Sequence, residues 1–428
     1  MQLKILMQMK FIQYIIPAFL FFFGINCFAQ EPVEKTFDSA DDTLFIPEIW
    51  EMDLDTLTRS WHEQYIVRKN ENPAYGDATA ICDSVYIARL AALNNVIRIP
   101  YTGTIRSSID LYVERRRKMV EHLLGLENFY FPMIEQTLDK YDLPLELKYL
   151  AVVESALNPM ATSRMGAAGL WQFMLPTGKR YNLEINSLVD ERRDPEKATE
   201  AACAFLKDLY RIYGDWALAL SAYNCGAGNV NKAIRLAGGR TDYWKIYPYL
   251  PKETRSYVPL FVAVNYIMEY YAHHQLRPKE MDFPVPTDTV MVNQVIHFDQ
   301  IAEVLNMDKE LIVKLNPQYK REIVPGNGKL RAIRLPALQT YAFVEKRDSI
   351  ANHRKDELFP FLNTQIISAG PERVTHLVKR GETLRSIEIK YGVSAANVRK
   401  WNRLKSSQLK AGQRLILYID NGGYPIKK

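Results

Sequence analysis

Cysteine is scarce in this sequence, with four among 428 residues. Small disulfide-stabilised folds use many more, so that class of protein is excluded. No cysteines and histidines have the spacing of a zinc site, and we expect no metal and no organic cofactor. Without Cys27, which lies in the N-terminal segment discussed below, three cysteines remain, namely Cys82, Cys203 and Cys225. Three is an odd number, so at least one of these thiols stays unpaired within the chain. A Cys203–Cys225 bridge and buried free thiols both remain open.

An excess of one charge is also lacking. The net charge is +6, and 24% of the residues are charged. This excess is too weak to indicate a nucleic-acid partner, but it suits an anionic polymer such as cell wall. With 47% hydrophobic residues the chain is typical of globular proteins, and its length predicts two or more domains.

The first 29 residues have the order of a secretory signal. Lys4 and Lys10 precede an apolar stretch over about 15–23, which is too short to span a membrane comfortably. Small residues follow, and the expected cleavage comes after Ala29. Cleavage would remove two lysines and no acidic residue, so the net charge of +6 would become +4.

Two other interpretations of this segment remain open. Cys27 could carry a lipid anchor, although Ile25 and Asn26 fit a lipoprotein cleavage site poorly. The segment could also stay uncleaved as an anchor. In each case we expect transport across the inner membrane to the periplasm, and attachment to the outer membrane stays open.

A helical block occupies the middle of the chain. Residues 30–95 predict a lead-in with little structure of its own. A mainly α-helical domain is expected over 96–278, since its apolar residues recur at helical spacing and Pro132, Pro144 and Pro195 lie near expected helix starts. The expected helices span 109–123, 127–141, 144–157, 195–213, 215–224, 229–237 and 254–272.

The expected secondary structure changes after a proline-bearing linker at 277–289. Residues 290–337 and 373–419 each have the pattern strand, helix, helix, strand, which indicates an internal duplication. Residues 338–372 are expected to link the two copies. The sequence therefore predicts an α+β multidomain protein, with a mainly helical domain followed by two small βααβ modules.

One acidic residue stands out in the stretch "AVVESALNPMATSRMGAAGLWQFM", residues 151–174. Asp142 can cap the helix that carries Glu154, Pro144 suits its first turn, and Pro159 ends it. One stripe of this helix then holds four residues at spacings i, i+3, i+4 and i+7, namely Leu147, Leu150, Ala151 and Glu154. Glu154 is therefore expected to face the core.

Burial at the carboxyl end of a helix raises the pKa of a carboxyl group, because a low dielectric and the helix dipole both disfavour its charge. A carboxyl group that stays protonated near neutral pH can serve as a general acid for glycosidic cleavage. Taken alone, an inward glutamate favours the structural interpretation, in which Glu154 is a buried residue with structural hydrogen bonds.

Three ordered motifs decide between these readings. The first runs from Glu154 to Met174 as E-S-x-x-N-P-x-A-x-S-x-x-G-A-x-G-L-W-Q-F-M. The others are "ALSAYNCGAGNV" at 219–230 and "LPKETRSYV" at 250–258. Together they resemble the signature of lytic transglycosylases of the soluble-lysozyme-like (SLT) superfamily. Residues 373–419 resemble the LysM glycan-binding module, and 290–337 resemble a degenerate LysM that lacks the G-[DE]-T turn.

The resemblance implies a lysozyme-like catalytic domain over 96–278, with Glu154 as its single acid/base. It implies that the enzyme cleaves the MurNAc–GlcNAc β-1,4 bond of peptidoglycan without water. The C6 hydroxyl of N-acetylmuramic acid attacks its own C1, so the ends are 1,6-anhydro-MurNAc. A hydrolytic muramidase or chitinase on the same fold, and a non-catalytic wall-binding protein, are the alternatives.

The resemblance also assigns substrate-binding roles. Gly166 and Gly169 would let the backbone approach the glycan. The expected substrate-binding residues are Ser155, Ser163, Gly169, Gln172, Tyr223, Asn224 and Glu253. In the LysM module the expected glycan-binding residues are Gly381, Glu382, Thr383, Asn402 and Leu404.

Without the resemblance, several of these residues have structural interpretations. Ser155, Ser163 and Glu253 could cap helices, and Tyr223 could pack in the core with Asn224 as a helix cap. Two other features favour structural roles outright. Trp171 is expected in the core, and His273-His274 are expected on a solvated helix surface rather than at a metal.

Overall fold

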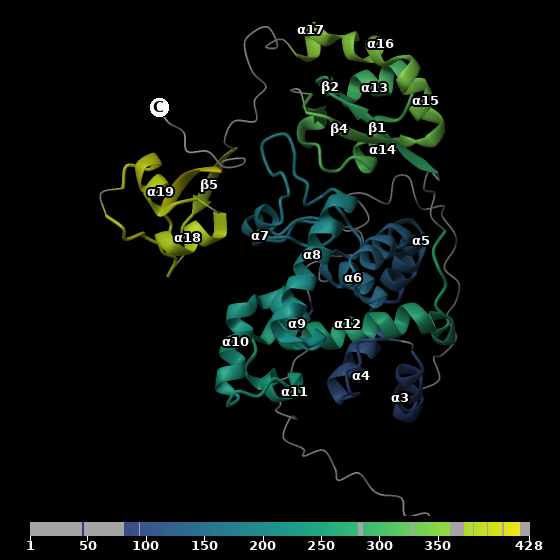
Figure 1. Cartoon of the computed structure of the whole chain (residues 1–428), viewed down its shortest axis with the longest axis vertical. Helices are drawn as coiled ribbons and strands as arrows, with labels where there is room; N and C mark the ends of the chain where they lie inside the picture. Colours follow the sequence, from purple (N-terminus) through teal and green to yellow (C-terminus); the bar gives the residue numbers. More distant parts are fainter. Residues whose placement is uncertain are drawn as a thin grey trace, which may run out of the picture. The chain divides into compact units, whose positions relative to one another are not determined.

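The structure is a computed structural model. It describes residues 45–46, 81–93, 95–280, 286–326, 329–359, 372–379, 381–391, 393–404 and 406–419, all within the compact unit Leu44–Lys428 (Figure 1). The expected signal at 1–29, with Cys27, and most of the expected lead-in lie outside the described residues. Among the described helices, none combines the length and apolar character needed to cross a membrane.

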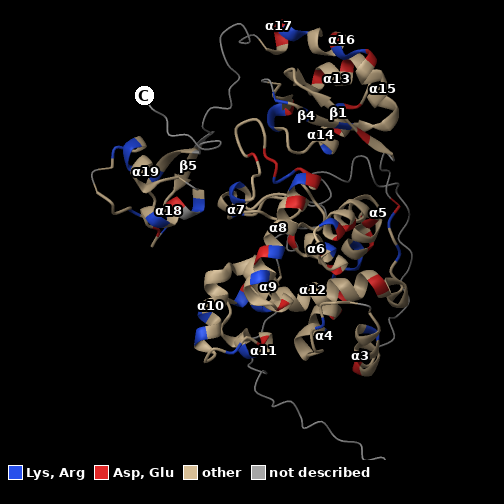
Figure 2. Cartoon of the chain, in the orientation of Figure 1, with Lys and Arg blue, Asp and Glu red and all other residues tan. Residues whose placement is uncertain are grey.

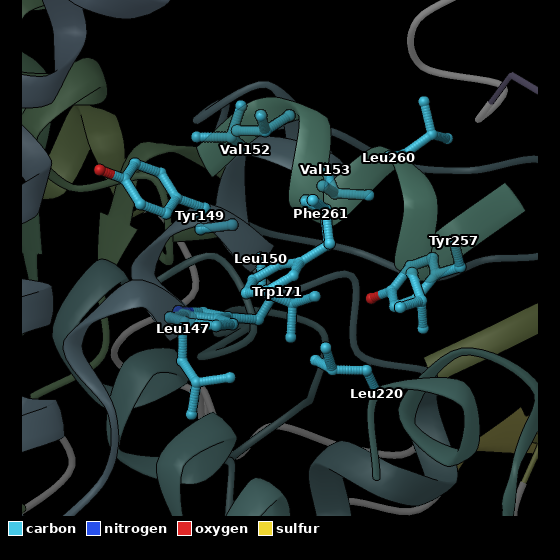
Figure 3. Packing of buried hydrophobic residues seen from close by; sticks show 14 of the residues in the cluster. Leu147, Tyr149, Leu150, Val152, Val153, Trp171, Leu220, Tyr257, Leu260 and Phe261 are labelled. Carbon is cyan, nitrogen blue, oxygen red and sulfur yellow. The ribbon is translucent and has the colours of Figure 1, made fainter. Parts of the chain in front are cut away.

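The expected mainly helical domain is confirmed, and its helices share one large hydrophobic core. In chain order these elements are α3 (Asp83–Ala92), α4 (Gly103–Asp110), the π-helix η1 (Leu111–Arg115), α5 (Arg117–Lys140), the 3₁₀-helix η2 (Leu145–Lys148), α6 (Tyr149–Ser155), α7 (Leu175–Arg180), α8 (Pro195–Tyr213), α9 (Trp216–Cys225), α10 (Ala227–Leu236), α11 (Tyr243–Ile246), η3 (Tyr247–Tyr249), α12 (Lys252–Tyr270) and η4 (Tyr271–His274). Figure 3 shows the centre of this core, where Trp171 lies among residues of η2, α6, α9 and α12.

Local signals explain where α8 and α9 begin. Asp194 accepts hydrogen bonds from the backbone N–H of Glu196 and Lys197, both at 3.1 Å, and Pro195 occupies the first turn of α8. Gly214, at φ 63°, ends α8 in the left-handed region. Asp215 then caps α9 by accepting from Leu218 N at 2.8 Å. The two helices can therefore turn back on each other within two residues.

Several local expectations are wrong. Pro132 lies inside α5 rather than at a helix start, and it is exposed on the surface of that helix. Asp142 has φ 55° and does not cap the next helix. His274 is buried and its Nε2 lies 2.9 Å from the hydroxyl of Tyr266, whereas only its neighbour His273 is on the surface.

The N-terminal lead-in contains a helix. Within 30–95, α3 places Tyr86 against Tyr266 with ring centroids 5.2 Å apart. Arg89 of α3 also donates to the hydroxyl of Tyr266 at 2.9 Å. α3 is therefore held against α12 by an aromatic contact and a hydrogen bond. The weak apolar pattern of residues 30–95 did not indicate this packing.

The first βααβ module is built around a second hydrophobic core, distinct from that of the helical domain. Strands β1 (Thr287–Val292) and β4 (Arg331–Pro336) pair antiparallel, as do β2 (Ile296–His297) and β3 (Ile323–Val324). Its helices are α13 (Phe298–Leu305), α14 (Lys309–Leu315), the 3₁₀-helix η5 (Lys320–Glu322), α15 (Ala337–Glu345), α16 (Arg347–Asn352) and α17 (Lys355–Leu358). Much of the expected linker 338–372 is therefore helical, because Phe343 and Ile350 are fully buried in the module core.

The second module repeats the plan with fewer elements. Strands β5 (Glu372–Leu377) and β6 (Arg414–Ile419) pair antiparallel, and α18 (Leu384–Tyr391) and α19 (Ala395–Trp401) lie between them in sequence. The α+β class with two small modules is confirmed. Acidic and basic residues are mixed along the described elements of all three parts rather than separated by sign (Figure 2).

One asparagine has the same structural role in both modules. After α14, Asn316 Nδ2 donates to Ile312 O at 2.9 Å and to Arg334 O at 2.8 Å, while its Oδ1 accepts from Arg334 N at 2.8 Å. After α19, Asn402 Nδ2 donates to Val398 O at 2.9 Å and to Ile416 O at 2.7 Å, and its Oδ1 accepts from Ile416 N at 2.6 Å. Each asparagine ties the end of the second helix to the last strand, which supports the internal duplication.

Candidate active site

Glu154 is delivered by the last turn of a short helix. The expected helix 144–157 is a 3₁₀-helix followed by α6, which ends at Ser155. Ala156 and Leu157 have φ of 52° and 59°, and Ala156 N donates to Val152 O at 2.9 Å. Two left-handed residues therefore reverse the chain directly after Glu154, before Pro159 is reached. The expected inward stripe holds for Leu147, Leu150 and Ala151, which are fully buried.

The Glu154 carboxyl group lies among tyrosines. Its side chain is partly buried, and the hydroxyl of Tyr257 donates a hydrogen bond to its Oε1. Burial raises the pKa of Glu154 to about 7, although the hydrogen bond from Tyr257 acts in the opposite direction. Near neutral pH, similar populations of Glu154 are therefore protonated and ionised, as a group that both gives and takes a proton requires.

Tyr257 and Tyr223 remain neutral hydrogen-bonding groups. Burial, with the nearby Glu154 carboxylate as a second cause, holds the pKa of each phenol well above its ordinary value. Tyr223 comes from α9 and Tyr257 from α12, so two helices distant in sequence reach the same carboxyl group. Tyr257 can therefore orient Glu154 without competing for its proton, whereas Tyr223 donates its own hydrogen to Trp171 O.

A tight loop follows Glu154 and contains most of the glycine-rich motif. Ser163 and Ala167 are joined by two hydrogen bonds, since Ser163 N donates to Ala167 O at 2.9 Å and Ala167 N donates to the side-chain Oγ of Ser163 at 3.1 Å. Ala168 and Phe173 form an antiparallel bridge. Gly169 has φ 86°, and a side chain there would put its Cβ 1.6 Å from Arg192 O, so only glycine fits.

Gln172 and Tyr223 hold this loop. Gln172 has φ 46°, and its Nε2 donates to Ala161 O at 3.2 Å and to Gly169 O at 2.9 Å. The hydroxyl of Tyr223 donates to Trp171 O at 2.8 Å. Both residues have partly exposed side chains, so each can fix the loop and still present an acceptor oxygen to a ligand.

The remaining expected binding residues differ in position. Asn224 is exposed at the end of α9, and its Oδ1 accepts from Thr254 Oγ1 at 2.8 Å. Glu253 is exposed in the first turn of α12. Ser155, in contrast, is fully buried, and its hydroxyl donates to Ala151 O of its own helix at 3.0 Å. Its bond is therefore internal to α6.

Sequence reasoning missed Tyr257 and Arg192. Tyr257 lies four residues after Glu253 in the E-T-x-x-Y-V motif, so helical spacing was the available signal. Arg192 carried no such signal, because its role depends on contacts with Gly166 and Phe173 that are distant in sequence. Trp171 is fully buried, with its Nε1 donating to Thr199 Oγ1 at 2.9 Å, which confirms the expected core position.

The two cysteines near the site are free thiols. Cys203 is buried in α8, and Cys225 is partly buried beside Asn224. Burial raises the pKa of both thiols. Of the two alternatives left open by the sequence, the structure has the unpaired one.

In the second module, several expected glycan-binding residues support the module itself. Glu382 Oε2 accepts from Lys379 N at 2.7 Å and lies 2.8 Å from His376 Nε2. Asn402 makes the strand-to-helix contacts described above, and Leu404 packs against the module core. Gly381, at φ 86°, has open space around it, and Thr383 is exposed. Gly381 and Thr383 are therefore the more accessible of the five.

One described cluster has the composition of a metal site. His297, Asp299 and Glu322 place ligand atoms within 4.8 Å of one another. Lys309 Nζ, however, lies 3.0 Å from Asp299 and 3.1 Å from Glu322, so an ammonium group already neutralises these carboxylates. The cluster is an ion-pair network of the first module.

Comparison with known proteins matches consecutive parts of the chain. The Transglycosylase SLT domain matches residues 131–246, the "Lytic transglycosylase MltD, LysM-like domain" matches 286–352, and the LysM domain matches 376–417. Membrane-bound lytic murein transglycosylase D of Escherichia coli K12 is 30% identical over 331 residues, which cover 74% of this chain and 70% of that relative. The chain belongs to the lytic transglycosylases.

Other lytic transglycosylases match the catalytic part. The soluble lytic murein transglycosylase of Escherichia coli K12 is 31% identical over 128 residues, or 28% of this chain and 20% of that relative. Among solved structures, the 70 kDa soluble lytic transglycosylase of Escherichia coli is 27% identical with a TM-score of 0.31, and the match covers 40% of this chain and 29% of that chain. This lytic transglycosylase is an enzyme of peptidoglycan, as the sequence predicted, and its SLT and LysM domains indicate peptidoglycan binding.

Proposed function

We propose that Glu154 is the single acid/base of this lytic transglycosylase, which cleaves the MurNAc–GlcNAc β-1,4 bond without water and leaves 1,6-anhydro-MurNAc ends. The observation that carries the proposal is a carboxyl group with a pKa of about 7 beside two neutral tyrosines. Burial and Tyr257 are the influences on that pKa among the described residues, so no second carboxylate acts on Glu154.

The proton to be transferred sits on Oε2 of Glu154. Because Tyr257 donates its own hydrogen to Oε1, that oxygen acts as an acceptor. Protonated Glu154 then gives the Oε2 proton to the glycosidic oxygen as the bond to C1 of the muramic acid breaks. The resulting carboxylate keeps its bond from Tyr257, which stabilises its charge until the second step.

The second functional group belongs to the sugar. Ordinary glycosidases need two carboxylates, with the second acting as nucleophile or as base for water. Here the C6 hydroxyl of the muramic acid attacks C1, and the Glu154 carboxylate takes the hydroxyl proton. One proton is given and one is taken back, so the enzyme is restored and no water is consumed.

The loop from Ser163 to Phe173 forms the wall that binds the sugar. Gly166 keeps the backbone free of a side chain there, Gly169 lets the loop pack closely on Arg192, and Gln172 and Tyr223 offer acceptor oxygens. Asn224 and Glu253 contribute from the ends of α9 and α12. Ser155 supports the wall indirectly through α6.

The expected bounds of the catalytic domain and of the second module are kept in this proposal. The catalytic domain spans 96–278, and the module at 373–419 binds glycan around Gly381 and Thr383. The protein is exported through its first 29 residues and works in the periplasm. Attachment to the outer membrane, through Cys27 or otherwise, is the remaining question for this segment.

Product analysis tests the mechanism. Wild type and Glu154→Gln are incubated with purified peptidoglycan, and the released muropeptides are measured by mass spectrometry. We expect wild type to give products one water lighter than hydrolysis products, and Glu154→Gln to lose turnover by roughly 10³-fold or more, since general acid–base catalysis alone contributes 10²–10⁴-fold.

Two results would contradict the proposal. Hydrated reducing ends from wild type would indicate a muramidase. Clearing of cell-wall suspensions by Glu154→Gln at the wild-type rate would exclude Glu154 as the acid. A matched control is Glu345→Gln, an exposed glutamate at the end of α15, which should behave as wild type.

A further inference from the structure

A segment of the catalytic domain is built into the core of the first module. Leu188 and Val189 are buried, and they belong to the same hydrophobic cluster as Phe298 and Tyr319 of the module. Asp190 N donates to Gln318 O at 2.8 Å, and Lys320 N donates to Leu188 O at 2.7 Å. Val189 and Tyr319 form an antiparallel bridge. The contact is thus a short stretch of paired backbone with an apolar core.

Ion pairs join the same two parts. Arg331 of β4 donates to both carboxylate oxygens of Glu184, at 2.9 and 2.8 Å, and Lys329 Nζ lies 2.6 Å from the same carboxylate. Burial opposes the charge of Glu184, but these cations outweigh it and lower the pKa to about 2. Lys320 Nζ also donates to Asn186 O at 2.9 Å. Glu184 therefore stays ionised and paired at any physiological pH.

The segment also contacts the sugar-binding wall. Asp190 is 1% exposed and holds Arg192 through two hydrogen bonds, from Nε at 2.9 Å and from an Nη at 2.8 Å. The other Nη of Arg192 donates to Gly166 O at 2.9 Å and to Phe173 O at 3.2 Å. Arg192, whose guanidinium group ties both ends of the Gly166–Phe173 loop together, therefore lies two positions after Asp190, whose backbone binds Gln318.

The equivalent part of the second module differs, because its described residues make their backbone hydrogen bonds within the module, such as Leu404 N to Arg399 O at 3.0 Å. Asn316 and Asn402 mark corresponding points, because each ties the second helix to the last strand. After Asn316 the chain pairs with the catalytic segment at Gln318 and Lys320. After Asn402, Arg403 is exposed. The two copies thus use the same stretch differently.

We propose that the first module is a fixed support of the active site rather than a tethered glycan-binding unit, and that Arg192 is the positioning residue through which it orders the Gly166–Phe173 loop. The inference rests on the proposed function of that loop as the sugar-binding wall. Because Arg192 binds loop carbonyls and no group of Glu154, it acts on catalysis through the position of Gln172 and the loop backbone.

A charge exchange at the junction tests this inference in the full-length protein. Glu184→Arg places a third cation beside Lys329 and Arg331, and Arg331→Glu places a second carboxylate beside Glu184. The double variant restores a pair of opposite charges at these two positions. The matched control is Glu303→Arg, which disrupts an ion pair with Arg354 inside the first module. Thermal unfolding identifies the temperature below which every variant is folded, and all measurements are made below that temperature.

Two readouts are taken, backbone hydrogen exchange by mass spectrometry and steady-state kinetics on soluble glycan strands. For each single junction variant we expect faster exchange at 163–173 and a kcat lower by roughly tenfold to a hundredfold, because a displacement of about 1 Å at a reacting centre can cost about 10²-fold. The double variant should return to within about twofold to threefold of wild type, and Glu303→Arg should equal wild type.

Arg192 is tested separately by chemical rescue. Arg192→Ala should lose turnover to a similar degree and regain part of it when guanidinium ion is added at millimolar concentration, whereas the Glu184→Arg variant should not respond. Folded single variants that exchange faster at 318–320 but keep wild-type exchange at 163–173 and wild-type kcat would overturn the inference. If wild type itself gave only hydrated products, the proposed function would fail instead, while the exchange measurement would still decide the support role.

Discussion

At the scale of single residues, Glu154 lies where its ionised form is unfavourable, and this same environment suits its proposed role as an acid. Its carboxyl group is enclosed by apolar side chains and two phenols, and burial raises its pKa to about 7. The folded protein therefore pays a cost whenever this group ionises. The same cost supplies the acid that cleavage needs.

Replacing Glu154 should stabilise the protein at alkaline pH. The pKa of Glu154 is higher in the folded than in the unfolded chain, where it is about 4.5, so stability falls as pH rises from about 4.5 to 7 and is then level. The difference corresponds to on the order of 3 kcal/mol at pH 8. Glu154→Gln should thus raise the free energy of unfolding at pH 8 but change it little near pH 4, as measured by urea unfolding.

An exposed glutamate provides the comparison. Glu345→Gln should leave the pH dependence of unfolding unchanged. Equal pH dependence in wild type and Glu154→Gln would mean that Glu154 titrates near its ordinary pKa in the folded protein. The proposed general acid would then be mostly ionised at neutral pH.

Tyr257→Phe should move the pH profile of turnover. The hydroxyl of Tyr257 favours the carboxylate and lowers the pKa of Glu154, so its removal raises that pKa further. Because the first step needs protonated Glu154, the alkaline limb of kcat should shift to higher pH. The maximum should fall by about tenfold to a hundredfold, since a hydrogen bond to a charged group contributes about 1.5–3 kcal/mol.

Tyr266→Phe is the matched control for this profile. Tyr266 is also buried in α12, but its hydroxyl binds Arg89 and His274 rather than Glu154. This variant should lose some stability and keep the wild-type pH profile. An unshifted alkaline limb in Tyr257→Phe would show that the hydroxyl does not act on Glu154.

At the scale of elements, the loop between α6 and α7 depends on one close backbone approach. Gly169→Ala would place a Cβ 1.6 Å from Arg192 O in a left-handed conformation. We expect a loss of at least about 3 kcal/mol in the free energy of unfolding and of nearly all activity. Thermal unfolding and cell-wall clearing measure both effects.

Gly166→Ala separates conformation from collision. Gly166 also has a positive φ, of 85°, but a Cβ there meets nothing within 4 Å. It should cost only about 1 kcal/mol in the free energy of unfolding, the usual penalty of a left-handed alanine. Equal losses in the two variants would argue against the packing of Gly169 on Arg192.

The helices show which structural features could be predicted from the sequence. The boundaries of α8 were predictable because Asp194, Pro195 and Gly214 are local signals. The position of α3 was not, because it depends on contacts with Tyr266 across the chain. For the same reason the inward direction of Glu154 was predictable from helical spacing, whereas its partner Tyr257 and the support by Arg192 depend on tertiary contacts.

At the scale of the whole molecule, the chain combines a catalytic domain with two modules of one plan. The core of the first module includes buried residues of the catalytic domain, whereas the buried core residues of the second all come from 378–417, with Val374 and Tyr391 also packed against the catalytic core. A protein that ends at Phe359 should therefore keep the catalytic domain and the first module. Its kcat on soluble glycan strands should equal that of the full chain.

The same truncation should weaken action on insoluble cell wall. A linked binding module raises the effective concentration of the substrate, so activity against intact sacculi should fall by about tenfold or more, measured as released muropeptides at limiting enzyme. Equal activity on sacculi with and without the second module would exclude a binding role for it. A loss on both substrates would instead assign it a role in the catalytic fold.

The asparagine shared by the two modules has a consequence for protein engineering. Asn316 and Asn402 close their modules with the same three hydrogen bonds, independently of what the following residues contact. The asparagine therefore closes the module, while the residues directly after it determine what the module contacts. A designer could exchange the residues after each asparagine and redirect a module between the protein's own surface and an external ligand without redesigning its core.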